Sequence, residues 1–552
     1  MQLKTISSLE KCFLDEGIDS KKEYKKATVL KNELFHFCVA YRSESGRVFA
    51  HLKLESEISD YISISRIESV PVRFAADPDF RDDFYLRDTP GLYPDLLQPL
   101  GQDNRLIVYT QTKALMAEVD VRPEIPAGKY PIRLSFETES ETYSTEFELE
   151  IINAVLPFQS LIYTQWFYCD SLKDYYETEM FDDRHFEIIE AFVKNAVKYG
   201  VNMLLTPVFT PPLDTAVGCE RETVQLVGVS VENGKYSFDF TLLDRWINMC
   251  NRVGVKYFEI SHFFTQWGAK AAPKIMATVN GEYRRIFGWD TPADSAEYSD
   301  FLKKFIPKLI SFMKSKNGAD KRCFFHISDE PDDKLFEGYM RARNIVAPLL
   351  KGYPIIDALS SYDIYSAGAV TAPICSTYFI EKFLENGVEG LWAYNCMEGA
   401  GISNRFISMP SQRNRIIGIQ LYKYNIKGYL HWGYNFYYNQ FSKDFVNPFI
   451  CTDGEYFTPS GDAFSVYPGR NGEPWNSLRL LVFSDALQDI RALTLCERIF
   501  GREYVENIIG EDAPNITFKN YPRSADYILE TRKKINAAIK YGTDCNNAQN
   551  VL

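Results

Sequence analysis

Eight short apolar runs, most of them separated by helical segments, dominate the chain after residue 155. Apolar residues recur at helical spacing between several of these runs, most clearly along residues 298–310. Strands that alternate with helices fold most economically as a parallel sheet closed into a barrel. The pattern therefore predicts an α/β fold, a (β/α)8 barrel. The expected strands are residues 161–168, 201–209, 256–264, 323–330, 353–360, 371–376, 390–395 and 428–435.

The first 155 residues have a different pattern, in which apolar and polar residues alternate and no helical period competes. Turn signals such as "IPAGKYPIRLSFE" separate the runs. We predict an all-β sandwich over residues 1–155, ended by Pro157. The barrel domain is expected over 156–500, with its closing helix near 478–500, and residues 501–552 as a short helical appendage.

Length and charge exclude several classes of protein. The 552 residues exceed a single domain of ~100–250 residues. A net charge of -13 without a stripe of Lys and Arg argues against a nucleic-acid partner. The start "MQLKTISSLEKCFLDEG" lacks the basic and apolar regions of a secretory leader, and no apolar stretch is long enough to span a membrane. We therefore expect a soluble, cytoplasmic protein with no membrane partner.

Cysteine and histidine spacing contains no metal motif. Eleven Cys occur without a C-x-x-C pair, and six His occur without H-x-H or H-E-x-x-H spacing, so we expect buried, reduced thiols. The acidic segment "SDEPDDK" (328–334) could suggest Mg²⁺ or Ca²⁺, but we interpret Asp332 and Asp333 as the beginning of a helix. We predict no metal and no cofactor.

Polar and aromatic side chains gather where the predicted strands end. In a (β/α)8 barrel these carboxyl ends form the active site. Indoles, phenols and amides together suit a sugar, which stacks its apolar face and hydrogen-bonds its hydroxyls. Any of the tryptophans could equally belong to the core, and the asparagines could cap backbone groups. The candidates for substrate binding are Trp166, His262, Trp392, Tyr394, Asn395, His431, Trp432, Asn435 and Tyr437.

Two consecutive acids, Asp329 and Glu330 in "FFHISDEP", end the fourth predicted strand. Ordinary glycosidases place two carboxyls roughly 5–5.5 Å or 6.5–9.5 Å apart, one on each side of the scissile bond. Consecutive residues cannot easily flank a bond in this way. Pro331 should hold Glu330 extended, so that the two carboxyls lie close together but point differently. A strand-end pair that caps the next helix is the structural alternative.

Such a pair fits substrate-assisted hydrolysis, in which the 2-acetamido group of the sugar attacks its own anomeric carbon. On this hypothesis Glu330 is the general acid and then the base, while Asp329 orients and polarises the acetamido group. A phenol such as Tyr362 could hydrogen-bond the amide oxygen, although a surface phenol is the alternative. We interpret His326 as a barrel-wall histidine rather than a catalyst.

Three segments resemble the catalytic domain of glycoside hydrolase family 123 and its relatives: "HISDEP" (326–331), "NRFISMPSQRNRIIGIQLYKYNIKGYLHWGYN" (404–435) and "GDAFSVYPGRNGEPWNSLRL" (461–480). The resemblance covers roughly residues 155–500. It implies a β-sandwich, a (β/α)8 barrel and metal-free β-N-acetylgalactosaminidase activity by substrate assistance. The family's acid pair maps onto Asp329 and Glu330, and its acetamido-binding tyrosine onto Tyr362. The expected partner is a glycan with a terminal β-N-acetylhexosamine, GalNAc preferred.

Two alternatives stay open. A retaining glycosidase of another specificity would use Glu330 as acid and Asp357 or Glu398 as nucleophile. A non-catalytic carbohydrate-binding protein would keep the aromatic platforms without turnover, although both acids of the pair are intact.

Overall fold

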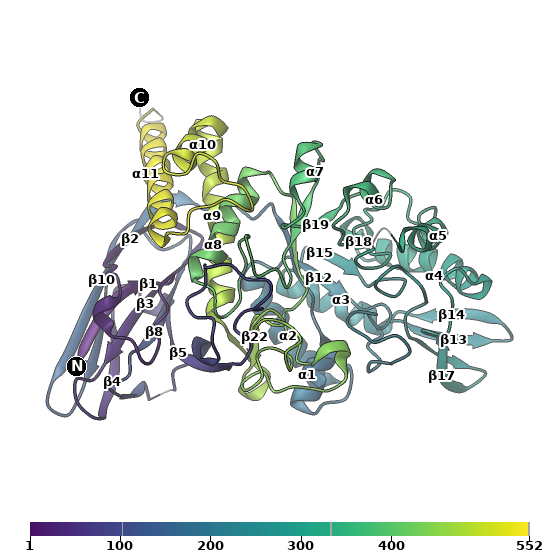
Figure 1. Cartoon of the computed structure of the whole chain (residues 1–552), viewed down its shortest axis with the longest axis horizontal. Helices are drawn as coiled ribbons and strands as arrows, with labels where there is room; N and C mark the ends of the chain where they lie inside the picture. The colour runs from purple at the N-terminus through teal and green to yellow at the C-terminus, as the bar shows by residue number, and fades with distance from the viewer. Residues whose placement is uncertain (102, 332–333, 550–552) are drawn as a thin grey trace.

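The computed structural model describes residues 1–101, 103–331 and 334–549, without the side chains of 545–549. Asp332 and Asp333, which we expected to begin a helix, lie outside these residues. In the described part, two five-stranded sheets at the N-terminus precede a seven-stranded parallel sheet with helices around it (Figure 1). The mixed α/β class is therefore confirmed.

The two N-terminal sheets share an apolar core. Alternating burial along the strands turns one face of each sheet inward. Phe37 and Phe147, one from each sheet, stack with ring centroids 4.3 Å apart. The first sheet has the order β1 (Gln2–Ser7), β3 (Glu33–Arg42), β8 (Lys113–Val121), β5 (Ile62–Val72) and β6 (Gly91–Pro99). The second has the order β2 (Lys26–Lys31), β10 (Thr142–Val155), β9 (Gly128–Glu137), β4 (Val48–Glu55) and β7 (Arg105–Val108).

Seven of the eight predicted barrel strands form the parallel sheet, each shorter than its apolar run in the sequence. Their order is β18 (Cys323–Phe325), β15 (Tyr257–Ile260), β12 (Met203–Thr206), β11 (Ile162–Gln165), β21 (Gly428–His431), β20 (Trp392–Tyr394) and β19 (Ile374–Ser376). All neighbouring pairs in this sheet are parallel.

The fifth predicted strand, residues 353–360, is not formed as a strand. It makes single parallel bridges, from Ile355 to β18 and from Ala358 to β19. Pro354 has no backbone N–H, and the N–H of Ile355 donates to the Thr371 hydroxyl rather than to a strand. A complete eight-stranded barrel is therefore not established, although the segment lies between both edge strands.

The predicted helices after residue 155 are present, and α9 has the predicted bounds. A four-stranded sheet within residues 228–287, which we did not predict, comprises β14 (Lys235–Asp239), β13 (Gly228–Glu232), β16 (Ile275–Val279) and β17 (Glu282–Phe287). A further hairpin pairs β22 (Val466–Pro468) with β23 (Pro474–Asn476). The helices are α1 (Cys169–Tyr176), α2 (Asp183–Lys198), α3 (Thr241–Val253), α4 (Ala296–Ser315), α5 (Phe336–Val346), α6 (Tyr362–Ser366), α7 (Glu381–Glu385), α8 (Ser411–Lys423), α9 (Leu478–Phe500), α10 (Arg502–Gly510) and α11 (Ala525–Gln549).

Helices α8 and α9 lie between the N-terminal sheets and the parallel sheet (Figure 1). Arg479 of α9 makes two hydrogen bonds to the carboxylate of Asp95 on β6, of 2.9 and 3.0 Å, and Tyr467 donates to the same carboxylate. His36 of β3 contacts Asp485 of α9 at 2.7 Å. Because these groups are buried, the contact between the two parts depends on paired charges as well as on apolar packing.

No helix in the described residues has both the length and the apolar character needed to cross a membrane. The ten cysteines whose side chains are described are all free thiols, and eight of them are buried.

We expect Asp95→Asn to lower the free energy of unfolding by about 3–5 kcal/mol, because it leaves the Arg479 guanidinium buried without its counter-charge. Differential scanning calorimetry checks this. The control is Asp120→Asn, which removes an exposed partner of Arg122 and should cost less than about 1 kcal/mol. Equal losses in the two variants would contradict the importance of the buried pair.

We also expect stability to fall between pH 6.5 and 9 as His36 loses its proton. Burial lowers the pKa of His36, but the carboxylates of Asp485 and Glu118 outweigh it and raise the pKa to about 9. A histidine whose pKa is higher in the folded state stabilises fully below its unfolded pKa, and this contribution is lost as the pH rises through 9. The loss is worth about 3 kcal/mol. Urea unfolding across this range should show a smaller decline for His36→Gln, and an equal decline would exclude a charged His36.

Candidate functional site

A cavity of about 650 Å³ opens beside the segments that follow β18 and β20. Its walls combine three carboxylates with aromatic and sulfur-containing side chains. The described residues that line it are Asp77, Phe80, Glu330, Pro331, Ser360, Ser361, Phe379, Tyr394, Cys396, Met397, Glu398 and Pro459. Glu330 and Tyr394 are thus the predicted site residues that the structure brings to one cavity.

Glu330 enters this cavity from a left-handed backbone conformation, with φ at +45°. Its N–H donates to the Ala358 carbonyl at 3.1 Å, and the Tyr394 hydroxyl donates to its Oε1 at 2.9 Å. The prediction that Pro331 holds Glu330 extended is wrong, because these tertiary contacts override the local preference. A non-glycine residue in this region costs about 1–3 kcal/mol and persists only where its surroundings hold it.

Asp329 lies behind Glu330, buried and outside the lining of the cavity. Gln266 contacts Asp329 Oδ2 through its Nε2 at 3.4 Å, a weak hydrogen bond. The Trp267 N–H donates to the Asp329 carbonyl at 2.9 Å and fixes the backbone. Among the described residues, the Asp329 carboxyl accepts no stronger side-chain hydrogen bond than this one.

Burial raises the pKa of both acids. The pKa of Asp329 is raised well above its usual value by burial and then by the charge of Glu330, while His326 opposes the shift. Burial of the carboxyl raises the pKa of Glu330, and the hydrogen bond from Tyr394 opposes this shift. The two carboxyls therefore compete for negative charge, and the pair retains a proton at higher pH than ordinary carboxylates do.

His326 lies beneath the pair, between two buried carboxylates. Its Nε2 is 2.7 Å from Glu259 Oε1, and its Nδ1 is 3.0 Å from Asp357 Oδ1. Burial lowers the pKa of His326, but the two carboxylates outweigh it and raise the pKa to about 9. His326 is thus buried in the wall, where its position inside an apolar run had placed it, and the raised pKa favours its charged form at neutral pH.

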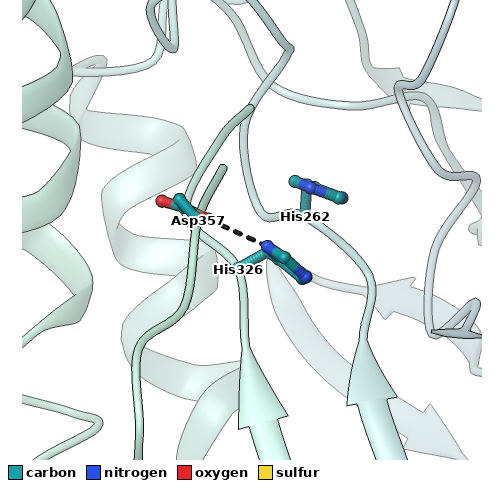
Figure 2. Close-up of side chains that lie close together, drawn as sticks. All are labelled: His262, His326 and Asp357. Carbon is teal, nitrogen blue, oxygen red and sulfur yellow. Dashed lines mark hydrogen bonds and ion pairs between the residues drawn. The ribbon is translucent and has the colours of Figure 1, made fainter. Parts of the chain in front are cut away.

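His262, His326 and Asp357 form a close group whose potential ligand atoms lie within 4.8 Å of one another (Figure 2). The geometry does not suit a metal ion. The two imidazoles stack with centroids 4.1 Å apart and planes inclined by 22°, so their in-plane lone pairs do not converge on one point. Both nitrogens of His326 already contact carboxylates. Among the described residues, neither nitrogen of His262 has a hydrogen-bond partner.

Most of the predicted sugar-binding residues are buried in this structure. Trp166 donates its indole N–H to Glu259 at 2.8 Å. Trp392 packs on Phe324, and a Cβ on Gly428 would lie only 2.1 Å from its ring, so the glycine makes room for the indole. Both tryptophans belong to the wall of the parallel sheet here, which is the alternative that the sequence left open.

The predicted residues after β20 and β21 are engaged by protein groups. The side chain of Asn435 bonds both backbone groups of Tyr168, and the Tyr437 hydroxyl donates to the Val466 carbonyl. Asn395 is held by Thr377 and Tyr429, and His431 contacts Asp462 at 3.3 Å. Trp432 is half-buried and donates to Asp462 at 2.9 Å. A sugar-binding role for these residues stays a prediction.

Tyr362 begins α6, next to the cavity but outside its lining. Its ring packs edge-on against Phe383 with centroids 5.5 Å apart, and the ammonium of Lys382 lies over it. The residues before it, Ser360 and Ser361, do line the cavity. Its catalytic role likewise stays a prediction.

Sequence reasoning missed several contributors, among them a buried acid and two residues of a loop between the N-terminal strands. Glu259 is an acid within the apolar run "KYFEISHFF", an unusual residue for a buried strand, and this was the available signal. Asp77 and Phe80 come from the long connection between β5 and β6, far from the barrel in sequence. A loop of 73–90 without secondary structure of its own is itself unusual and often functional.

Comparison with known proteins identifies the family. In structure, a family 123 glycoside hydrolase from Clostridium perfringens matches with a TM-score of 0.74 at 14% identity, covering 99% of this chain and 100% of its own. At that identity the match establishes a shared fold. Two further matches are too distant to support an argument. A β-glucuronidase from Parabacteroides merdae has a TM-score of 0.28 at 10% identity and covers 89% of this chain and 51% of its own. An endo-β-1,4-mannanase from Thermotoga petrophila has a TM-score of 0.32 at 11% identity and covers 61% of this chain and 77% of its own.

No protein of curated function matches the chain. The model of the glycoside hydrolase 123 catalytic domain matches residues 166–496. Since this match covers more than half of the chain and includes the acid pair, the protein belongs to glycoside hydrolase family 123.

Proposed function

We propose that the protein is an exo-acting β-N-acetylgalactosaminidase that retains anomeric configuration by substrate-assisted catalysis. The observation that carries the proposal is the pair of consecutive acids in the segment that follows β18, of which Glu330 lines the cavity and Asp329 is buried behind it. Neighbouring residues of one strand end cannot flank a glycosidic bond, so the nucleophile comes from the substrate.

In the first step, the acetamido oxygen of the bound sugar attacks C1 while Glu330 gives its proton to the leaving oxygen. The C1–O bond to the aglycone breaks, and a cyclic oxazolinium forms, whose N–H is held by Asp329. In the second step Glu330 removes a proton from water, the water oxygen bonds to C1, and the ring opens. Two displacements at C1 restore the β configuration.

The proton on the pair moves when the substrate binds. Among the described residues of the free protein, the Asp329 carboxyl has one weak donor, Gln266, whereas Glu330 accepts a hydrogen bond from Tyr394, so the neutral form is favoured at Asp329. The substrate's amide N–H supplies a stronger donor to Asp329 and favours its ionised form. The proton then resides on Glu330, where general acid catalysis requires it.

The choice of sugar and the closed barrel belong to the proposal as well. We propose GalNAc as the sugar because the family resemblance implies it. We also propose that residues 353–360 complete the eighth position of the barrel through their bridges to β18 and β19. The similar Clostridium perfringens protein is described as acting on glycolipid glycans, which makes a glycolipid glycan a suitable natural substrate to test.

Glu398 supports one alternative, a retaining glycosidase with a protein nucleophile, because it lines the same cavity as Glu330. Its carboxylate is engaged on both oxygens, by the Ser376 hydroxyl and by the Cys396 N–H. Asp357, the other candidate, is fully buried and accepts hydrogen bonds from Tyr339 and from the N–H groups of Ile327 and Ser328. The substrate's own acetamido group is therefore the better-placed nucleophile.

We expect the protein to hydrolyse aryl β-GalNAc faster than aryl β-GlcNAc, and aryl β-Gal not at all, because the last lacks an acetamido group. A thiazoline mimic of the oxazoline should inhibit competitively, since it reproduces the cyclic intermediate. Initial rates with the three glycosides, with and without the thiazoline, check this. Cleavage of β-Gal without thiazoline sensitivity would favour Glu398 as nucleophile, and no turnover of any glycoside would indicate a binding protein.

The two acids should respond differently to substitution. Glu330→Gln should reduce kcat/KM by about 10²–10⁴ for an alkyl glycoside and much less for an activated aryl glycoside, which leaves without a proton. The alkaline limb of the pH profile should disappear with it. Asp329→Asn should reduce both rates by about 10²–10³, because orientation and charge stabilisation are needed whatever the leaving group.

The matched control is Glu337→Gln, at an exposed acid on α5 outside the cavity. It should keep wild-type rates on both substrates. Wild-type rates in both Asp329→Asn and Glu330→Gln would overturn the site assignment.

A further inference from the structure

The loop between β5 and β6 (residues 73–90), which belongs to the N-terminal sheets, forms one wall of the cavity through Asp77 and Phe80. Other parts of the lining come from segments that follow β19 and β20, with Phe379 and Met397. The candidate site is therefore built from two parts of the chain. The loop between β5 and β6 supplies one part, and the segments that follow strands of the parallel sheet, including the acid pair, supply the other.

This loop is attached to the rest of the molecule on both sides of Phe80. Before it, the Ser460 N–H donates to the Phe74 carbonyl at 2.9 Å. After it, the buried guanidinium of Arg413 makes two hydrogen bonds to Asp82, of 2.7 and 2.8 Å. A Cβ on Gly399 would lie 2.6 Å from the Phe80 carbonyl, so the loop packs directly on that glycine. Phe80 is thereby placed by contacts and not left as a free loop tip.

Three apolar side chains in the cavity keep a large exposed surface: Phe80 at 37%, Phe379 at 50% and Met397 at 40%. Exposed apolar groups are ordinary when scattered, but three that line one cavity together mark a binding surface. They line the same cavity as Glu330, the proposed proton donor, whereas Asp329 lies outside the cavity lining. A group that protonates the leaving oxygen must touch the leaving group, so this cavity is on the leaving-group side.

The charge of the cavity selects among leaving groups. Its described lining residues include three carboxylates, Asp77, Glu330 and Glu398, and no Lys, Arg or His. Carboxylates accept hydrogen bonds from hydroxyls and repel anions, and flat apolar rings stack on the C–H face of a pyranose. A neutral saccharide can hydrogen-bond to the carboxylates and stack on the apolar side chains, whereas a sulfated or sialylated saccharide is repelled by the negative charge of the carboxylates.

We propose that Phe80, Phe379 and Met397 form a subsite for the aglycone, and that it accepts a neutral saccharide and rejects an anionic one. This inference rests on the proposed hydrolase function and adds the class of leaving group. It assigns a direct part in substrate recognition to the N-terminal sheets, through Phe80.

The test compares two substrates with the same terminal β-GalNAc, an oligosaccharide in which it is linked to galactose, and β-GalNAc fluoride, which has no saccharide aglycone. The ratio of their kcat/KM values should fall about 10-fold in Phe80→Ala and in Phe379→Ala, because each loses one stacking ring. Phe80→Trp should restore the ratio. The control Phe49→Ala, at an exposed ring on β4, should leave it at the wild-type value.

A second arm places a sulfate on the galactose of the oligosaccharide, which should lower kcat/KM at least about 10-fold. If wild-type protein cleaves neither the fluoride nor the oligosaccharide, the hydrolase function fails and the subsite with it. If it cleaves both but Phe80→Ala and Phe379→Ala keep the wild-type ratio, the subsite alone is overturned. Equal cleavage of the sulfated oligosaccharide would overturn the selection for neutral saccharides.

Discussion

A charged histidine held between two buried carboxylates joins the strand ends on which the candidate site is built. Glu259 comes from β15, His326 follows β18, and Asp357 belongs to the segment that bridges β18 and β19 without forming a strand. The Asp357 carboxylate also accepts the backbone N–H groups that lead to Asp329. Side-chain charge thus adds to the few backbone hydrogen bonds between this segment and the two edge strands, such as that from the Ile356 N–H to the Phe325 carbonyl. Removing one charged partner would leave the others uncompensated.

The same histidine makes two adjacent acids tolerable. Burial and mutual repulsion raise the pKa of Asp329, and Glu259 and Asp357 add to this, so the positive charge of His326 is the stabilising influence on its ionised form. The balance leaves Asp329 sensitive to any new donor, since Gln266 contacts it only weakly. In the proposed mechanism a substrate amide is that donor, and the acid pair can therefore divide its roles only when a substrate is bound.

Hydrophobic patterns in the sequence predicted most of the helices and strands, but they predicted few of the residues that line the cavity. Hydrophobic period identified helices such as α4, and apolar runs identified seven strands of the parallel sheet, because these depend on nearby residues. Strand-end position singled out Glu330 and Tyr394, which both line the cavity, while their roles stay predictions. It could not distinguish an indole that faces the cavity from one such as Trp392 that fills the space beside Gly428, because that choice depends on a residue from another strand.

The conformation of Glu330 and the position of Phe80 have the same kind of cause. The residue before a proline prefers an extended backbone, yet the carbonyl of Ala358 and the hydroxyl of Tyr394 hold Glu330 in the left-handed region. Phe80 reaches the cavity because Arg413, more than 300 residues away in sequence, binds Asp82. Glu330 and Phe80 are thus both positioned by long-range contacts, so the N-terminal sheets and the parallel sheet have to fold against each other before the cavity exists.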